Sequence, residues 1–572
     1  MRPALTRVQW IVLGGIVGLA AGLRLIGLRY GLPAVYNPDE VAIMSRALAF
    51  ARGDLNPHNF LYPTLYFYVL FAWEGLAAIA AVATGAIDSF GAFQREFFVD
   101  PTRVYVAGRL LTALLGTATV VATFTLARRL AGPIAGIAAA AAVAVSPLHV
   151  RDSHYVKHDV PVTLLIVLAY LAYDRLWRVF PDRTGVFEEV RDREVIWAGM
   201  ITGLAFSTHY YAIFLAIPLA WSAARRAATP AETMRRVALA GLASAAVFFL
   251  CSPFILAEPA TALRDIQANR QIVVDRAIGS LGYGATLARY AAMLVRDTLG
   301  WPFVLLAALG LADALRGDPR RALWLLSFGI PFFFFIASTY PASRYLIPLV
   351  PFLAVLAGMC VARVATWSPA AAALAVPALA ALPLLTSVRT DLFIRQTDTR
   401  TLAARFIESH VPAGATILTQ PYSVPLEPTA ASLREAVARS GRDMPTKTRL
   451  QAERTPYPAP AYRLVHLGRG LDADKLYLPL EAVGGTDPLT PVREEHVAFV
   501  VLKRYNDEAP AMQPLTAALA RDGRRLAVFS PYREGAAARP EPFLHNTDAR
   551  MTVELERSGP VVEIWQLNGP RS

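Results

Sequence analysis

The sequence is short of charge and of cysteine. Charged residues make up 17% of its 572 residues, hydrophobic residues make up 55%, and the mean hydropathy is +0.39. So little charge excludes an ordinary soluble protein. The only two cysteines, Cys251 and Cys360, both fall inside apolar runs, so no disulfide framework is expected and the redox compartment stays open.

What the sequence has instead is a series of apolar runs long enough to span a bilayer, which recur up to about residue 388. They predict a polytopic membrane protein whose first partner is the lipid bilayer. The formal net charge is +12, but arginine pairs lie in short loops beside apolar runs, at 128–129, 225–226, 235–236 and 320–321. We interpret this basic excess as a determinant of membrane topology and expect no nucleic-acid partner.

The arginines set an expected direction for each run, because loops rich in arginine stay in the cytoplasm. The first run, from Trp10 to about Leu28, is predicted to be a retained helix rather than a cleaved signal peptide, so that residues 31–59 lie outside. Residues 60–85 are long enough to cross the membrane. The pair at 128–129 reaches the cytoplasm, however, only if this stretch is an interfacial helix.

With that choice, the arginines predict about 11 spans and a C-terminal tail on the outer side. After the first run, the spans are expected at 103–127, 133–148, 160–177, 195–207, 210–222, 236–256, 298–314, 321–338, 345–364 and 368–387. The segments 195–207 and 210–222 are short for spans. A single long helix there would reverse the direction of everything that follows.

After Val388 the composition changes, since charge and proline rise and no run is long enough to span. Local patterns predict helices at 401–410 and 514–523 and strands at 496–502, 524–530 and 561–568. Residues 389–572 are therefore expected to form a soluble α/β domain outside the membrane, following an all-α transmembrane domain at 1–388. The stretch 425–465, rich in Pro, Ala and Thr, is predicted to be a long loop.

This topology gathers ionisable residues from distant parts of the chain on the outer face. They are Asp39, Glu40, Arg46, Asp54 and His58 in the first loop, Arg151, Asp152, His154, Lys157, His158 and Asp159 in the second, and His209 and Arg344 later. Ionisable groups near hydrocarbon are costly unless they are paired or used, so the set predicts one functional site. The alternative is that outer loops are wet and naturally carry charge.

Four of the acids also have a structural explanation. Asp39 and Asp159 precede helices that they would cap, and Glu40 lies in a first helical turn, where the helix dipole favours acids. Asp152 could be a loop acid that pairs with Arg151.

Three further assignments stay open. His154 and His158 are four residues apart beside Asp159, which on one helix face would suit a divalent metal, but this signal is weak and no cofactor is firmly expected. Arg344 could be an interfacial anchor. The aromatic stretch from Tyr62 to Trp73 is attributed to membrane packing rather than to sugar binding.

Five motifs together resemble GT-C glycosyltransferases of the protein O-mannosyltransferase and aminoarabinose transferase group, the dolichyl-phosphate-mannose-protein mannosyltransferase-like proteins. They are NPDEVAIMSRAL from residue 37, NFLYPTLYFYVL from 59, SPLHVRDSHYVKHDVPVTLLIVLAY from 146, STHYY from 207 and SRYLIPLVPF from 343. The resemblance covers roughly residues 1 to 390. It implies a GT-C membrane domain and transfer of a sugar from a polyprenyl-phosphate donor to a hydroxyl acceptor, on the outer side of a bacterial inner membrane.

The resemblance also implies roles for residues. The family carries an acidic pair in its first outer loop, matched by Asp39 and Glu40, and an acid in its second, best matched by Asp159; Asp39 would be the general base. Aminoarabinose transferases carry a lysine before a Pro-Pro pair in the first loop, and this chain reads Leu61-Tyr62-Pro63-Thr64 instead. The donor phosphate must then meet other residues.

The residue types suit this chemistry independently of the resemblance. Negative charge develops on the departing phosphate, and Arg344, His209 and Lys157 are the available cations. A carboxylate can take the proton of the attacking hydroxyl, and direct displacement with one base inverts the sugar carbon. Asp152, His154, His158, Arg46 and His58 are possible additional site residues. A membrane transporter and a lipid-linked polysaccharide polymerase or ligase remain the alternative functions.

Overall fold

The computed structural model describes residues 4–177, 191–271, 282–470, 472–504, 510–536 and 551–568. The chain divides into two compact units. Unit 1 comprises Met1–Leu28, Pro38–Ala77 and Tyr105–Asp391, and unit 2 comprises Arg29–Asn37, Ala78–Val104 and Leu392–Ser572. Unit 2 therefore contains two N-terminal segments as well as the C-terminal region.

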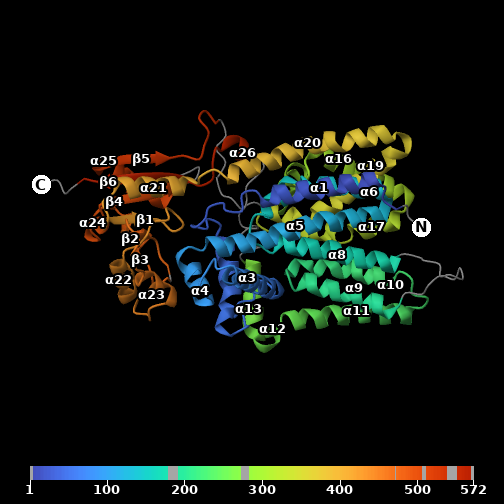
Figure 1. The fold of residues 1–572 in the computed structure, drawn as a ribbon, viewed down its shortest axis with the longest axis horizontal. Helices are drawn as coiled ribbons and strands as arrows, with labels where there is room; N and C mark the ends of the chain where they lie inside the picture. Colours follow the sequence, from blue (N-terminus) through green and yellow to red (C-terminus); the bar gives the residue numbers. More distant parts are fainter. Residues whose placement is uncertain are drawn as a thin grey trace. The chain divides into compact units, whose positions relative to one another are not determined.

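Unit 1 is a helix bundle in which the long helices α1, α5, α8, α9 and α11 run lengthwise beside one another (Figure 1). Its helices, some of which extend into unit 2, are α1 (Arg7–Leu25), α2 (Pro38–Ala49), η1 (Phe50–Arg52), α3 (Leu65–Ala83), α5 (Thr102–Ala131), α6 (Pro133–Ala144), α7 (Pro147–Asp152), α8 (Asp159–Trp177), α9 (Asp192–Phe206), η2 (Tyr210–Leu215), α10 (Ala216–Ala224), α11 (Pro230–Cys251), α12 (Phe254–Ala257), α13 (Pro259–Arg270), α15 (Tyr283–Met293), η4 (Leu294–Thr298), α16 (Trp301–Gly317), α17 (Pro319–Leu326), α18 (Gly329–Ile336), η5 (Ser343–Leu349), α19 (Val350–Trp367) and α20 (Pro369–Ile394).

Eight helices in the described part of the chain are long and apolar enough to cross a membrane, and α15, η4 and α16 together form one further span if their bend of 107° is a break within it. Two shorter apolar helices, Pro133–Ala144 and Tyr210–Ala224, account for much of the difference from the expected number of about 11 spans. The predicted multi-pass membrane domain is confirmed. The eight include α3, which was expected at the interface, and its position in the membrane stays a prediction.

The chain breaks between Ser207 and His209, so that α9 and the pair η2–α10 are separate elements rather than one long helix. Helix α9 packs along α11 at two glycines. A Cβ on Gly199 or Gly203 would collide with the backbone carbonyl of Ala240 or Ser244 of α11. Small residues at such contacts let two backbones approach closely, which is how helices associate inside a membrane without a hydrophobic driving force.

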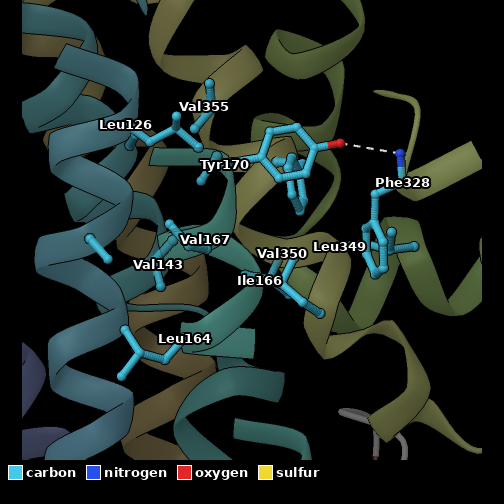
Figure 2. Packing of buried hydrophobic residues seen from close by; sticks show 14 of the residues in the cluster. Leu126, Val143, Leu164, Ile166, Val167, Tyr170, Phe328, Leu349, Val350 and Val355 are labelled. Atoms are coloured by element: carbon cyan, nitrogen blue, oxygen red, sulfur yellow. Dashed lines mark hydrogen bonds between the residues drawn. The ribbon is translucent and has the colours of Figure 1, made fainter. Parts of the chain in front are cut away.

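The main apolar cluster of unit 1 includes residues of α5, α6, α8, α18, η5 and α19. Figure 2 shows Ile166 and Val167 of α8 between Val143 and the pair Leu349 and Val350. The backbone N–H of Phe328 donates to the Tyr170 hydroxyl at 3.2 Å. This hydrogen bond satisfies a backbone group at the break between α17 and α18, which would otherwise be costly in an apolar environment.

Unit 2 is built on a six-stranded mixed sheet with the strand order β3-β2-β1-β4-β6-β5. Its strands are β1 (Thr416–Thr419), β2 (Arg463–Leu467), β3 (Leu476–Leu478), β4 (Phe499–Arg504), β5 (Gly523–Phe529) and β6 (Val561–Leu567). Its helices include α4 (Phe90–Val99), α21 (Thr399–His410), α22 (Ala430–Ser440), α23 (Thr446–Ala452), α24 (Thr490–Glu494), α25 (Gln513–Asp522), α26 (Met551–Glu554) and the short η6 (Leu480–Val483) and η7 (Pro510–Met512). Strands β1 to β4 pair in parallel, and β6 pairs antiparallel with β4 and β5.

Alternate residues of the central strands enter two separate cores, as the two-residue period of a strand requires. Ile417, Phe499 and Val501 pack with α21, whereas Leu418 and Val500 pack in the cluster that includes α25. The α/β character of this region, its helices at α21 and α25 and its strands β4, β5 and β6 match the sequence prediction. The loop predicted at 425–465 is wrong, because α22 and α23 lie there, and β1, β2 and β3 were not predicted.

Candidate active site

Glu40 is fully buried in a bidentate ion pair with Arg109 of α5. Arg109 Nε and Nη2 donate to its two carboxylate oxygens at 2.9 and 2.8 Å, and the backbone N–H of Val156 donates to Oε1 at 3.0 Å. Arg109 Nη1 also donates to the carbonyl of Leu28 at 2.7 Å. Both oxygens of Glu40 are thus engaged. The pair fixes the first turn of α2 against α5 and against the loop that carries Lys157.

Asp39, one residue earlier, has a side chain that is 38% exposed and lies 3.2 Å from the ammonium of Lys157. The ammonium itself is buried, with the Lys157 side chain 3% exposed. Lys157 is the only lysine before Lys447 in the sequence. An acid from the first predicted outer loop and a cation from the second therefore meet, and the acid stays accessible.

Two more charged residues complete this group, which we call the Asp39 cluster: Asp39, Lys157, Asp159 and Arg344. Asp159 is the first residue of α8 and is buried. Its carboxylate is stabilised by the charges of Arg344 and Lys157 and opposed by those of Asp152 and Asp39. Arg344, in the first turn of η5, is in turn stabilised by Asp39 and Asp159. Two carboxylates and two cations from three parts of the chain thus share one electrostatic environment.

An aromatic group lies beside the cluster. The rings of Tyr62 and His158 are stacked, with centroids 4.4 Å apart and planes at 8°, and His209 meets the edge of Tyr62 at 5.3 Å. Burial lowers the pKa of His158 to about 3, with a further contribution from the charge of Arg46, and burial also holds the pKa of His209 well below its usual range. Both rings are therefore neutral at neutral pH. His209 was expected to bind phosphate as a cation, and it can do so only as a neutral N–H donor.

Replacing His158 with Asn is expected to reduce the loss of stability that the protein suffers as the pH falls below neutral. The unfolded chain takes up a proton on this histidine near pH ~6.5, but the folded protein does so only near pH 3, so stability falls as the pH drops through this window. In thermal unfolding scans between about pH 7 and pH 4.5, the His158→Asn variant should lose less melting temperature than the wild type. The exposed His410, changed in the same way, is the control, and equal slopes for His158→Asn and wild type would contradict the assignment.

Asp152 forms an ion pair with its neighbour Arg151, which is the structural role that the sequence also suggested for it. Arg151 Nε and Nη2 donate to Asp152 Oδ2 at 3.0 and 2.7 Å, and Nη2 also donates to Ser343 Oγ at 3.1 Å. Both side chains are buried. The pair ties α7 to the start of η5, and so supports Arg344 in the next position of the chain.

The residues of the weak metal alternative point to different surroundings. His154 has its ring nitrogens 2.9 Å from the carbonyl of Val150 and 2.6 Å from that of Ile26, whereas His158 stacks on Tyr62. Helix α7 ends at Asp152, so the spacing of four residues does not put the two histidines on one helix face. Within the ranges that the structure describes, no three His, Cys, Asp or Glu side chains are grouped as metal ligands.

The two remaining predicted residues differ in position. Arg46 of α2 interacts electrostatically with His158 and with Tyr62, so it lies near the aromatic group. His58 is exposed, with its ring nitrogens 2.8 Å from Asp54 and 3.0 Å from Glu258. These contacts tie the first predicted outer loop to Glu258, and within the described residues His58 forms no hydrogen bond or ion pair with the Asp39 cluster.

Sequence reasoning missed Arg109 and Tyr62. An arginine inside a 30-residue apolar helix is itself a signal, because a charge in a membrane span is costly and is usually paired or used. Tyr62 was attributed to packing, and only its stacking on His158 associates it with the site.

Residues 102–256 match the family model described as dolichyl-phosphate-mannose-protein mannosyltransferase. The fold resembles that of ArnT from Cupriavidus metallidurans. The comparison with ArnT in the apo state gives a TM-score of 0.51 at 14% identity, with 97% of each chain covered. The comparison with ArnT bound to undecaprenyl phosphate gives a TM-score of 0.50 at 15% identity, with 98% of each chain covered. The apo oligosaccharyltransferase of Archaeoglobus fulgidus gives a TM-score of 0.49 at 12% identity, with 86% of this chain and 69% of that one covered. No curated protein matches the sequence.

The predicted resemblance to GT-C glycosyltransferases of the mannosyltransferase and ArnT type is thereby confirmed, as is the fold class: a polytopic helical membrane domain with a C-terminal α/β domain. These findings support a membrane glycosyltransferase.

Proposed function

We propose that this protein transfers a sugar from a polyprenyl-phosphate donor to a hydroxyl acceptor, with inversion, on the outer side of a bacterial inner membrane. The observation that carries the proposal is the meeting of Asp39 with Lys157 at 3.2 Å, beside Asp159 and Arg344. The structure of ArnT with undecaprenyl phosphate bound supports a lipid phosphate as the donor's leaving group in a protein of this fold.

Asp39 is the best candidate for the general base. Glu40 has both oxygens occupied by Arg109 and Val156, Asp152 is paired with Arg151, and Asp159 is buried, whereas the Asp39 side chain is 38% exposed. In the reaction the acceptor hydroxyl forms a bond to the anomeric carbon as the bond from that carbon to the phosphate oxygen breaks. Asp39 takes the hydroxyl proton, and polyprenyl phosphate leaves with the electron pair.

Arg344 and Lys157 supply the positive charge that the departing phosphate requires. Lys157 is buried and Arg344 is half-buried, and charges in such surroundings act more strongly than they would in water. The contact of Lys157 with Asp39 also has a consequence for the base. When a donor phosphate draws the ammonium toward itself, the carboxylate of Asp39 loses a cation and becomes a stronger base.

The positions of these residues favour the proposed function over transport, one of its two alternatives. Asp39 and Asp159 lie in the first turns of α2 and α8, and Arg344 lies in the first turn of η5, so the cluster is built from element ends. A transporter would be expected to gather its charges at mid-membrane on broken helices. A polymerase or ligase would use a similar lipid-linked donor and differs in its product.

Replacing Arg344 with Gln is expected to lower kcat/KM for the lipid-linked donor by about 10- to 100-fold, because one charge-assisted contact to phosphate is lost. The measurement is transfer from defined polyprenyl-phosphate sugars by protein in proteoliposomes. Arg363→Gln is the matched control, since Arg363 is 53% exposed on α19. An equal effect of both replacements would contradict phosphate binding by Arg344.

The function itself is tested by mass spectrometry of outer-face glycans in a deletion strain, followed by reconstitution with the donor so identified. Loss of one sugar from one acceptor is the expected result and names both substrates. Loss of polymer length would favour the polymerase alternative. An unchanged set of glycans, together with a defect in uptake or export, would favour transport.

A further inference from the structure

The ring of Tyr62 is covered by another ring on one face only. It stacks on His158, with the two centroids 4.4 Å apart, and His209 lies 5.3 Å from Tyr62 and 6.4 Å from His158. These three distances put His209 beside the Tyr62 ring, at nearly a right angle to the direction of His158. Tyr62 has no third ring partner among the residues that the structure describes, and it is half-buried. A ligand can therefore stack on Tyr62 only from the side opposite His158.

His158, which backs Tyr62, is fixed by packing. The rings of Tyr66 and Phe67 meet it at steep angles, with centroids 4.8 and 5.1 Å away and planes at 63° and 85°. The histidine is only 2% exposed and, as a neutral ring, draws no counter-ion into this packing. Tyr62 thus rests on an uncharged, closely packed support.

The backbone on both sides of Tyr62 is also fixed. The carbonyl of Leu61 accepts a hydrogen bond from Asn269 Nδ2 of α13 at 2.9 Å, and the carbonyl one residue earlier accepts one from the Tyr210 hydroxyl at 2.9 Å. Two residues after Tyr62, the backbone N–H donates to Ser252 Oγ at 3.1 Å. All of these residues belong to unit 1. A ring held in this way is preorganised, so a ligand that stacks on it loses little affinity to ordering of the protein.

His209 brings a hydrogen-bond donor to the edge of the Tyr62 ring. Its Nδ1 accepts the backbone N–H of Tyr211 at 3.4 Å. A neutral imidazole that accepts at Nδ1 carries its proton at Nε2, so Nε2–H is the donor. The residue is half-buried. An uncharged donor beside an aromatic ring suits a hydroxyl group of a ligand, because the few polar groups of a binding site fix the ligand's orientation.

The charges around Tyr62 match a phosphate that carries an uncharged sugar. In the Asp39 cluster two carboxylates face two cations, and Arg46, which interacts electrostatically with His158 and Tyr62, adds a third cation. A phosphodiester brings one negative charge and so balances this excess. An amino sugar would bring another cation and a sugar acid another anion, and an unbalanced charge is costly in buried surroundings.

We propose that Tyr62 is the platform on which the sugar ring of the donor stacks, that His209 Nε2–H binds one of its hydroxyls, and that this sugar is uncharged. The C–H groups on one face of a sugar ring are weakly positive and meet the negative face of an aromatic ring. The inference rests on the proposed function, because it needs the phosphate of the same donor at Arg344 and Lys157. It gives Tyr62 a binding role in place of the membrane packing that the sequence suggested.

The first test measures binding to the full-length protein in proteoliposomes, by displacement of labelled undecaprenyl phosphate. The reference ligand is undecaprenyl methyl phosphate, which keeps the charge of the phosphodiester and lacks the sugar. At least one of the undecaprenyl-phosphate derivatives of glucose, galactose and mannose should bind about 5- to 50-fold more tightly than the reference. Undecaprenyl-phosphate aminoarabinose should bind no more tightly than the reference. No gain for any of the three hexoses, or an aminoarabinose donor that equals the best of them, would overturn the proposal.

Variants then assign the gain to residues. Tyr62→Leu and His209→Ala should each weaken binding of the preferred hexose donor by about 2- to 10-fold and leave binding of undecaprenyl methyl phosphate unchanged. Tyr62→Trp should keep most of the affinity for the hexose donor, since it retains an aromatic face. Tyr68→Leu is the matched control, because Tyr68 is also half-buried and packs on Phe50 at 5.1 Å. Equal losses for both ligands, or a Tyr62→Trp variant as weak as Tyr62→Leu, would contradict a stacking platform.

Binding and transfer together separate this inference from the proposed function. Sugar-dependent binding that Tyr62→Leu removes, in a protein that transfers no sugar from any donor, would mean that the platform exists and the transfer function is wrong. Transfer from a hexose donor with KM and kcat unchanged in Tyr62→Leu would mean that the function stands and the platform is wrong.

Discussion

Asp39→Asn is expected to abolish sugar transfer while the protein still folds, inserts and binds lipid phosphate. Asparagine keeps the shape of the side chain but cannot take the acceptor proton, and general-base assistance is typically worth ~10²–10⁴ in rate. The loss should appear in kcat, because Arg344 and Lys157 still bind the donor. Transfer from a polyprenyl-phosphate sugar in proteoliposomes measures the rate, and displacement of a labelled lipid phosphate measures binding.

The matched control for this replacement is Asp54→Asn. Asp54 follows α2 and η1 in the first predicted outer loop, its side chain is 57% exposed, and its ion-pair partner is His58 rather than Lys157. Activity near the wild-type level is expected for the control. Transfer by Asp39→Asn within a few-fold of wild type would mean that another group accepts the proton, and Asp159 would then be the next residue to replace.

Arg109→Leu is expected to lower the free energy of unfolding by about 3–5 kcal/mol, because the carboxylate of Glu40 would be left buried without its cation. Both side chains are 0% exposed, so water cannot replace the lost contacts. Thermal unfolding in a fixed detergent measures the effect. Asp39 adjoins Glu40, so the variant should also lose transfer activity at temperatures where it is still folded.

A second variant distinguishes a buried charge from a packing defect. Replacing Glu40 and Arg109 together with leucine removes both charges and should recover part of the lost stability. Recovery should be incomplete, because the N–H of Val156 then lacks its acceptor, a cost of about 1–3 kcal/mol. A double variant less stable than Arg109→Leu alone would contradict the assignment of the loss to an unpaired charge.

The membrane domain was predictable because a bilayer leaves few choices. A span must be apolar over about 20 residues and must satisfy its own backbone, so the runs at 103–127 and 160–177 predict α5 (Thr102–Ala131) and α8 (Asp159–Trp177) to within a few residues at most ends. The α/β domain was harder. Strands β1, β2 and β3 have only 4, 5 and 3 residues, too few for a two-residue period to be recognised. Helix α22 was missed although Thr429 caps its start and Gly441 its end.

The sequence predicts which charged residues gather but not how they pair, and their functional roles stay a prediction. Asp39, Asp159 and Arg344 lie in the first turns of α2, α8 and η5, and Lys157 lies just before α8, where these residues share one electrostatic environment. Partner choice needs the folded structure: Glu40 pairs with a residue 69 positions away. A metal site at His154, His158 and Asp159 would require one helix to carry both histidines, whereas α7 ends at Asp152.

The most direct test of the account combines sidedness with donor binding at Asp39. A single cysteine replaces Asp39 in a protein that lacks Cys251 and Cys360, and intact cells are treated with a membrane-impermeant thiol reagent. We expect the cysteine to react from outside and polyprenyl phosphate to protect it, while a cysteine at Asp54 reacts without protection. Reaction only after the membrane is opened, or equal protection at both positions, would contradict a lipid-phosphate site on the outer face.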